Sequence, residues 1–515
     1  MKTSILSYCR RFMLVAAPLL SLSGCERADL IIRNVTVIDG SGGATVIADV
    51  SIAGDRIAAI GDLSGVSSDS ILDGTGLALA PGFIDAHSHH DWGLDKDPDG
   101  TAVVSQGVTT IVIGQDGGSP LPLARHFARR EKNPAAVNIA AFSGHNAIRD
   151  SILGKDFKRK ATAEEVNKMK ALLLLDLEAG ALGLSTGLEY DPGIYSADDE
   201  VLELAKVLPP FGGRYISHLR SEDRYFHQAV DEIIRIGQVT GVPVQISHFK
   251  LAMRGLWGQA GSVLRKLDSA RSAGVDISAD WYPYAYWSST IRVLFPDRNF
   301  TDRREAEFIL REVTSADGII FSHYSPNPEY DGKSLAQVAQ AAGMPPEDML
   351  IELIRRLDAC DASGDDCSGS IVATSMSEAD MDMLLKWPHT MVCSDGSSSG
   401  RHPRGYGAFT RVLGRYVRDT SVIDLATAVH KMTGLTAERL GITGRGFIRP
   451  GQHADLVLFD PSTVADRSTI QDPQALSVGI NRVWVNGKTV FTGGKTTGMH
   501  PGRILRRSSP ASGDR

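Results

Sequence analysis

Short apolar runs separated by polar turns occupy both ends of the chain. They are rich in Val and Ile and are broken by Gly and Asp, a pattern typical of β-strands; they lie at 30–32, 35–38, 50–52, 56–60, 455–460 and 483–490. Asn486-Gly487 is in addition a strong hairpin dipeptide. We expect the two ends, residues 25–80 and 441–505, to pair into one small β-sandwich, with 506–515 as a tail.

The middle of the chain, residues 81–440, alternates apolar β-type runs with helix-like segments. This alternation is typical of βα units around a parallel sheet. The β-type runs after residue 100 lie at 107–114, 137–142, 183–186, 214–218, 244–248, 275–280, 371–374 and 391–395. The repeat is interrupted between about 287 and 370. The predicted fold class is therefore α/β, a (β/α)8 TIM-type barrel with a helical insertion late in the barrel and the small β-sandwich formed from both termini.

Polar residues capable of metal binding follow these runs. In a barrel of this type the active site lies at the carboxyl ends of the strands, which is where these residues are expected. They are His87, His89, Asp116, Glu189, His218, His248, Asp280 and Asp395. In an extended segment His87 and His89 point the same way, and two buried imidazoles need a common partner. Taken alone, this pair fits two hydrogen-bonded core histidines equally well. The four histidines and an aspartate in barrel order favour a site for Zn²⁺, with one or two divalent ions.

Such a site has a defined chemistry. A bound zinc ion lowers the pKa of a water molecule to about 7 and polarises a carbonyl oxygen. A carboxylate at the end of the last strand can take the proton from that water and pass it to a leaving amine. Asp395 occupies that position.

Composition narrows the class of protein. The chain has 515 residues, of which 42% are hydrophobic, enough for one large domain with an appendage. The formal charge of -7 is spread without long like-charge runs, so nucleic-acid binding is excluded from the hypotheses.

The N-terminus has the features of an export signal. Lys2, Arg10 and Arg11 precede a short apolar stretch, and Leu22-Ser23-Gly24-Cys25 resembles a bacterial lipobox, the alternative being an ordinary secretory signal. We expect residues 1–24 to be removed. The mature protein is then periplasmic and attached to the membrane through a lipidated Cys25, with Glu26 compatible with the outer membrane. In that compartment Cys360 and Cys367 can form a disulfide.

Eight motifs resemble one known family, the N-acyl-D-amino-acid deacylases (D-aminoacylases) of the amidohydrolase superfamily. They are PGFIDAHSHHD at 81–91, GVTTIVIG at 107–114, STGLEYDPG at 185–193, YISHLRSE at 215–222, VQISHFK at 244–250, DWYPY at 280–284, CSDG at 393–396 and HPRGYG at 402–407. The resemblance implies that His218 and His248 hold the tighter zinc and that His87 and His89 approach a second position. It implies that Asp395 is the general acid and base. It also implies a clamp for the substrate carboxylate made of Lys250, Arg404 and Tyr282.

One position departs from the family pattern. The family has a zinc-binding cysteine after the GVTTIVIG strand, whereas this chain has Asp116. A carboxylate is a harder ligand than a thiolate, so the site is expected to be less selective for zinc, to bind two metals, or to use Glu189 as a bridging ligand. Asp116 can alternatively be a turn residue before two glycines, and Glu189 a structural partner of a cation in the barrel.

Three functions from different classes remain. The leading hypothesis is a metal-dependent hydrolase of N-acyl amino acids, most of all N-acyl-D-amino acids, as small-molecule substrates. The second is a cyclic-amide hydrolase of the hydantoinase or dihydroorotase type, and the third is a surface-anchored binding protein that kept the barrel. Asp395 and the four histidines speak against the third, and the carboxylate clamp favours linear substrates over rings. His145 is expected to be a core histidine whose ring is hydrogen-bonded. His323 is expected to be a contact made by the insertion.

Overall fold

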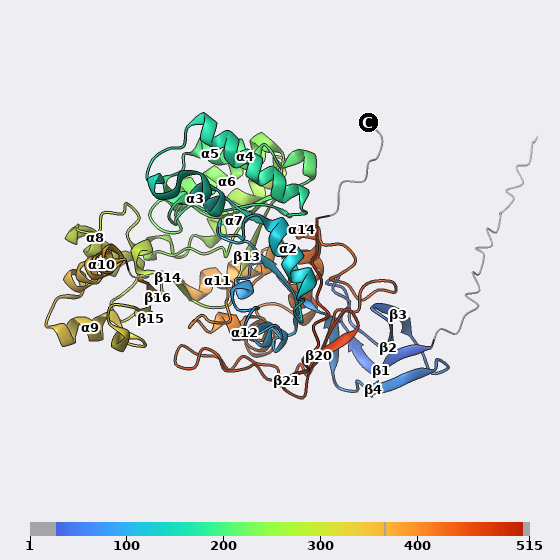
Figure 1. The fold of residues 1–515 in the computed structure, drawn as a ribbon. Coiled ribbons are helices and arrows are strands. Elements are labelled where there is room, and N and C mark those ends of the chain that lie inside the picture. The colour runs from blue at the N-terminus through green and yellow to red at the C-terminus, as the bar shows by residue number, and fades with distance from the viewer. Residues whose placement is uncertain (1–26, 365–366, 508–515) are drawn as a thin grey trace, which may run out of the picture.

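The computed structural model describes residues 27–364 and 367–507. Figure 1 shows three parts: a central barrel, a sheet domain in which strands from both ends of the chain lie together, and an insertion on the opposite side of the barrel. No helix in the described part of the chain is long and apolar enough to cross a bilayer.

Eight parallel strands form the barrel. They are β6 (Phe83–Asp85), β7 (Val108–Ile113), β8 (Asn138–Ala141), β10 (Gly183–Gly187), β11 (Arg214–His218), β12 (Val244–Ile246), β13 (Ile277–Trp281) and β17 (Thr390–Val392). Neighbours pair in the order β6-β7-β8 and β10-β11-β12-β13-β17, and the short β9 (Ser143–Gly144) continues β8 and pairs with β10. A parallel bridge between Ser88 and Gly396 closes the ring between β6 and β17.

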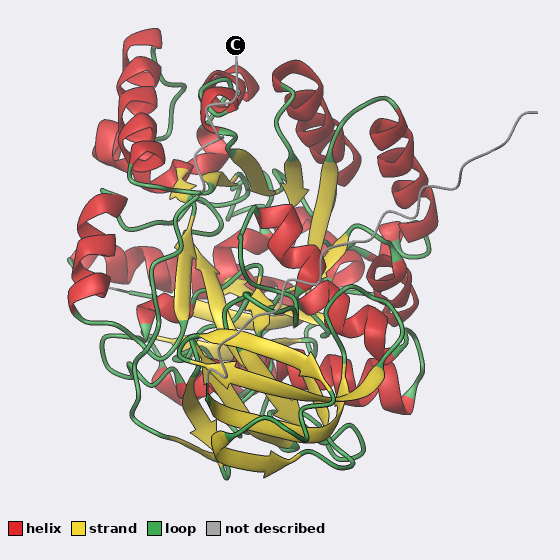
Figure 2. Ribbon diagram, turned by 90° about the vertical axis from the view of Figure 1, so that its right-hand side faces the viewer, coloured by secondary structure: helices red, strands yellow, loops and turns green. Residues whose placement is uncertain are grey.

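Helices surround these strands, as Figure 2 shows. They are α1 (Thr101–Val104), α2 (Leu123–Lys132), α3 (His145–Leu153), α4 (Ala163–Glu178), α5 (Asp198–Ala205), α6 (Phe226–Thr240), α7 (Ala260–Ser272), α11 (Glu378–Lys386), α12 (Arg404–Arg411), α13 (Leu425–Met432) and α14 (Gly434–Leu440). Every residue of β7 is buried, as expected for a parallel strand covered on both faces. Helix α6 buries Phe226, Val230, Ile233 and Gly237 on one stripe and ends at Gly241 in the left-handed conformation that glycine adopts without strain.

The two ends of the chain meet in one mixed sheet. Its N-terminal strands are β1 (Ala28–Val37), β2 (Val46–Ala53), β3 (Arg56–Gly61), β4 (Ser68–Asp73) and β5 (Ala78–Pro81), and its C-terminal strands are β18 (Leu456–Phe459), β19 (Ile480–Val485), β20 (Lys488–Thr492) and β21 (Lys495–Thr496). Antiparallel pairing of β5 with β18 joins the two sets, so the prediction that both termini build one small β domain is confirmed, and the strands of the predicted β-sandwich form one connected sheet. The predicted hairpin at Asn486-Gly487 is also confirmed, because both residues have positive φ between β19 and β20.

A buried polar network fixes this sheet domain to the barrel. Asp455 lies directly before β18 and accepts hydrogen bonds from Arg445, from the Asn138 side chain of β8 (2.9 Å) and from the backbone N–H of Asn486 (2.6 Å). The side chains of Asp455 and Arg445 are almost completely buried. The network thus joins residues of the barrel, the sheet domain and the segment between them.

Asp455→Ala is expected to lower the free energy of unfolding by about 3–5 kcal/mol, since it leaves the buried Arg445 without its counter-charge. Asp460→Ala is the matched control, because Asp460 follows the same strand β18 but is partly exposed. Denaturant unfolding of both variants measures the effect. Equal, small losses in the two variants would contradict the structural role given to the network.

The insertion between β13 and β17 contains helices and a sheet of its own. Its helices are α8 (Arg303–Phe308), α9 (Leu335–Ala342) and α10 (Pro346–Ser363), and its strands are β14 (Tyr286–Thr290), β15 (Ile319–Tyr324) and β16 (Gly369–Thr374). The strands pair antiparallel in the order β14-β16-β15. The prediction of a barrel strand at 371–374 is therefore wrong, because a short apolar run does not reveal whether it pairs in a parallel or an antiparallel sheet. Cys360 and Cys367 form a disulfide at the end of α10, as the sequence allowed.

Candidate metal centre at the barrel mouth

Four predicted site residues meet at the carboxyl ends of β6, β7 and β17. The Nε2 atoms of His87 and His89 lie 3.4 and 3.3 Å from Asp116 Oδ2, and 3.5 and 3.4 Å from Asp395 Oδ1. All four ligand atoms lie within 4.8 Å of one another. Backbone hydrogen bonds hold the two loops together, from Asp395 N–H to His87 O and from His89 N–H to Gly396 O, both 2.9 Å.

Asp116 also belongs to a second group of ligand atoms. Its other oxygen, Oδ1, lies 3.2 Å from His248 Nε2, which is 2.9 Å from His218 Nδ1. Asp116 therefore stands between the two pairs of histidines, with one oxygen toward each. Asp116, His248 and Asp395 all have positive φ, a conformation that costs energy for these residues and that is concentrated at functional sites.

The donor atoms fit a divalent cation. Both ring nitrogens of His87 are buried and have no hydrogen-bond partner among the described residues, which is costly unless another group binds them. Burial disfavours the charged form of His89, yet hydrogen bonds to Asp116 and Asp395 raise its pKa to about 10. Burial and the neighbouring Lys250 likewise disfavour the charged form of His248. Nearby carboxylates outweigh them and raise the pKa of His248 to about 10. The carboxylates around His89 and His248 thus stabilise positive charge between these side chains. The nitrogen and oxygen donors there are ligand types that zinc accepts.

Glu189 lies outside the group formed around Asp116. Its Oε2 is 2.8 Å from His218 Nε2, the ring nitrogen that faces away from Asp116. This side of His218 also holds Glu222, and the three residues form a separate group of possible ligands. The structure therefore does not bring Glu189 to a position that bridges the pairs of histidines.

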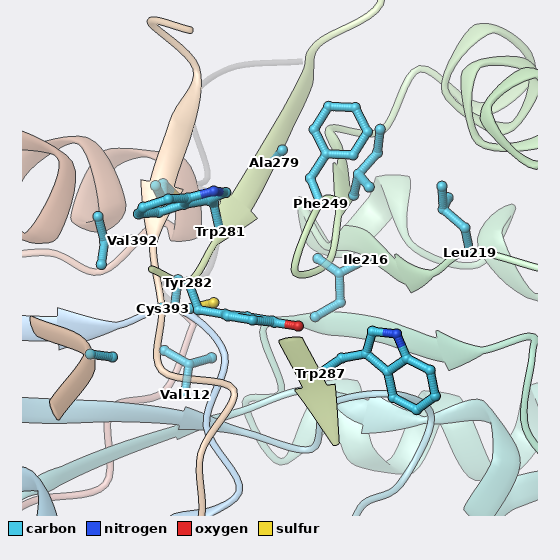
Figure 3. Packing of buried hydrophobic residues seen from close by; sticks show 14 of the residues in the cluster. Val112, Ile216, Leu219, Phe249, Ala279, Trp281, Tyr282, Trp287, Val392 and Cys393 are labelled. Atoms are coloured by element: carbon cyan, nitrogen blue, oxygen red, sulfur yellow. The ribbon is translucent and has the colours of Figure 1, made fainter. Parts of the chain in front are cut away.

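Three predicted carboxylate-binding residues gather beside Asp395. Arg404 Nη1 lies 2.7 Å from Asp395 Oδ2, and the guanidinium lies 4.8 Å from the centre of the Tyr282 ring. Lys250 Nζ lies 5.7 Å from the same ring. The Tyr282 hydroxyl is buried without a hydrogen-bond partner among the described residues, and Figure 3 shows it pointing toward Ile216 and Trp287.

Asp395 and Arg404 stabilise each other's charged forms. Burial opposes ionisation of Asp395, but Arg404 and the nearby histidines hold the pKa of that carboxyl well below its usual range. Burial also disfavours the charged form of Arg404. The Asp395 carboxylate outweighs this effect, so the pKa of Arg404 is raised. At neutral pH Asp395 is therefore an ionised carboxylate.

Two adjoining cavities reach this centre. A small one of about 40 Å³ is lined by His218, His248, Lys250 and the apolar Trp287, Val293 and Leu294, among others. A larger one of about 710 Å³ is lined by His89 and Asp116, by the exposed Trp92 and by residues of the insertion. Asp395 and Arg404 line both cavities. The larger volume is in the range of small-molecule sites.

The remaining conspicuous residues have structural roles. Asp85 accepts hydrogen bonds from the backbone and side chain of Ser394 and does not join the metal-binding groups of the described residues. Asp280 accepts the backbone N–H of His248 at 2.7 Å and so fixes the loop after β12. His145 is paired with the buried Glu200, as expected of a satisfied core histidine. His323 lies on β15 of the insertion and lines the larger cavity.

The sequence reasoning missed Glu222. Both of its oxygens lie 2.7 Å from Lys250 Nζ, and Oε1 lies 3.1 Å from His248 Nδ1. The sequence offers a partial signal, because a buried lysine two residues after a predicted ligand requires a counter-charge, but the sequence does not identify the residue that supplies it.

Comparison with known proteins gives consistent matches over most of the chain. The family model described as "Amidohydrolase family" matches residues 70–243 and 379–491. D-aminoacylase of Alcaligenes xylosoxydans xylosoxydans is 37% identical over 95% of this chain and 100% of its own length. N-acyl-D-glutamate deacylase of the same organism is 38% identical over 95% of this chain and 98% of its own.

Solved structures agree with these matches. The crystal structure of N-acyl-D-glutamate deacylase from Bordetella bronchiseptica, complexed with zinc and a phosphonate mimic of the tetrahedral intermediate, superposes with a TM-score of 0.84 at 34% identity, covering 93% of this chain and all of that one. D-hydantoinase superposes with a TM-score of 0.57 at 16% identity, a likeness of fold alone.

Proposed function

Because this chain belongs to the amidohydrolase family, and within it to the D-aminoacylases, we propose that the protein is a metal-dependent hydrolase that cleaves the linear amide bond of N-acyl-D-amino acids to a free amino acid and a carboxylate. The observation that carries the proposal is the group of His87, His89, Asp116 and Asp395, with Arg404 bound to the last of them. It brings together candidate metal ligands, a proton acceptor and a recognition group for a free carboxylate, and His89, Asp116, Asp395 and Arg404 line the larger cavity.

In this proposal His218, His248 and Asp116 would hold one zinc ion, and His87 and His89 would offer a second position beside Asp116. When bound, a divalent cation supplies Lewis acidity, which acidifies water and polarises the amide carbonyl. Nitrogen ligands with one hard carboxylate make the site less selective for zinc than a thiolate would.

Asp395 moves the proton. Its carboxylate takes a proton from the attacking water as the new C–O bond forms, and returns it to the amide nitrogen as the C–N bond breaks. Arg404 keeps Asp395 ionised and presents a planar fork of donors to the substrate carboxylate. Lys250 and the Tyr282 hydroxyl complete the clamp, which a ring amide lacking a carboxylate would leave unused.

Removal of metal is expected to abolish turnover of N-acetyl-D-amino acids, and added Zn²⁺ to restore it. The assay compares chelator-treated and zinc-supplemented protein on N-acetyl-D-amino acids, N-acetyl-L-amino acids and hydantoins. Preferred cleavage of hydantoins would favour the cyclic-amide hydrolase instead. Turnover that persists after complete metal removal would contradict the proposal.

We also propose that the protein is exported and anchored by lipid on Cys25, in the outer membrane. The support is the lipobox-like Leu22-Ser23-Gly24-Cys25, which lies outside the described residues. Cys25→Ser is expected to shift the protein from the membrane fraction to the soluble periplasmic fraction. Fractionation measures this, with Cys393→Ser as the control at a buried free cysteine. Unchanged membrane partitioning of the Cys25 variant would refute the anchor.

A further inference from the structure

The two nitrogens of His248 face different partners. Nε2 points to Asp116, whereas Nδ1 lies 3.1 Å from Glu222 Oε1 and 2.7 Å from Lys250 Nζ. The side chains of His248, Glu222 and Lys250 are each more than 90% buried, so these contacts are made largely out of solvent.

The chemistry of imidazole selects one of these contacts. A neutral histidine that offers the lone pair of Nε2 to a metal carries its proton on Nδ1, which must then donate. The Lys250 ammonium has no lone pair and cannot accept that hydrogen bond. Glu222 is therefore the acceptor, whereas a hydrogen bond from Lys250 to Nδ1 would stabilise the tautomer with its proton on Nε2, where it blocks the metal.

The fold holds Glu222 at this place. It lies in the loop four residues after His218, and its backbone carbonyl accepts a hydrogen bond of 2.9 Å from Ala252 N–H in the loop that follows β12. The loops after β11 and β12 are thus tied together at Glu222. Its carboxylate accepts from Lys250 with both oxygens, which draws the ammonium charge toward Glu222.

We propose that Glu222 is a positioning residue of the metal centre: it accepts the Nδ1–H of His248, fixes the tautomer that leaves Nε2 free for the metal, and restrains the competing Lys250. Outer partners of this kind raise the basicity of a ligating histidine, and their loss costs about 10- to 100-fold in metal affinity. The inference rests on the metal site of the proposed function but not on the substrate.

The test measures the dissociation constant of Zn²⁺ alone, by competition with a chromogenic chelator, on the full-length protein. Glu222→Gln preserves the shape and removes the charge, and is expected to raise the constant about 10- to 100-fold. Glu200→Gln is the matched control. Glu200 is also buried and accepts a hydrogen bond of 2.8 Å from His145, but this pair lies away from the metal centre. Glu200→Gln is expected to leave the constant unchanged.

Lys250→Met separates positioning from mere packing. Removal of the ammonium eliminates both the donor that favours the wrong tautomer and a positive charge near the metal, so the zinc constant is expected to equal or fall below that of the wild type. Increases of similar size in Glu222→Gln and Lys250→Met would show a packing role and overturn the inference, as would unchanged affinity in Glu222→Gln. Absence of zinc affinity in the wild type would overturn the proposed function as well, which distinguishes the two failures.

Discussion

Asp395→Asn is expected to lower turnover by about 10²- to 10⁴-fold, the usual contribution of a general acid and base. The amide cannot take a proton from water, and it leaves Arg404 without its buried counter-charge. Because the histidines and Asp116 remain, we expect most of the bound metal to stay. Activity on N-acetyl-D-amino acids and metal content are measured on the same preparation.

Asp380→Asn provides the control for loss of a buried aspartate. Asp380 accepts the backbone N–H groups of Gly258 and Ala260, away from the metal centre. Its asparagine variant is expected to keep both activity and metal. If Asp395→Asn lost metal as completely as a histidine variant does, Asp395 would be a principal ligand rather than the proton carrier.

The positions of the candidate ligands could be predicted from sequence because the geometry of a parallel barrel is nearly independent of detail. A polar residue directly after an apolar strand reaches the same rim wherever it lies in the chain. His87, His218 and Asp395 are separated from one another by more than 100 residues, yet each lies at or just beyond the end of its own strand and all three reach one mouth. The same rule failed at β16, whose apolar residues pair in the sheet of the insertion.

The contacts of Glu189 and Glu222 could not be predicted in the same way. Both lie in loops beyond the strand ends, where no periodicity fixes the direction of a side chain. Glu189 was expected as a possible bridge between metals, but it contacts Nε2 of His218, whereas Nδ1 of that ring contacts His248. Which nitrogen of a histidine a carboxylate meets depends on tertiary packing, and a strand pattern carries no information on it.

Asp116 is the residue at which this chain departs from the pattern of its family, and its replacement has the second large expected effect. Each of its oxygens faces one pair of histidines, so Asp116→Ala removes a ligand from both positions at once. We expect the zinc affinity to fall by more than the about 10- to 100-fold that outer-shell changes cost. Activity should fall with the metal content.

Asp116→Cys should restore both quantities, because a thiolate supplies a single soft atom in place of the two carboxylate oxygens. The restored site is expected to prefer zinc over manganese more strongly than the wild type does, since thiolate ligands select softer metals. Bound zinc and manganese are measured after equilibration with equal concentrations of each. Because Asp116 has a φ of +52°, the alanine and cysteine variants carry the same backbone strain, and any difference between them reports on the ligand. Full zinc occupancy in Asp116→Ala would instead make Asp116 a turn residue and leave the four histidines and Asp395 to hold the metal.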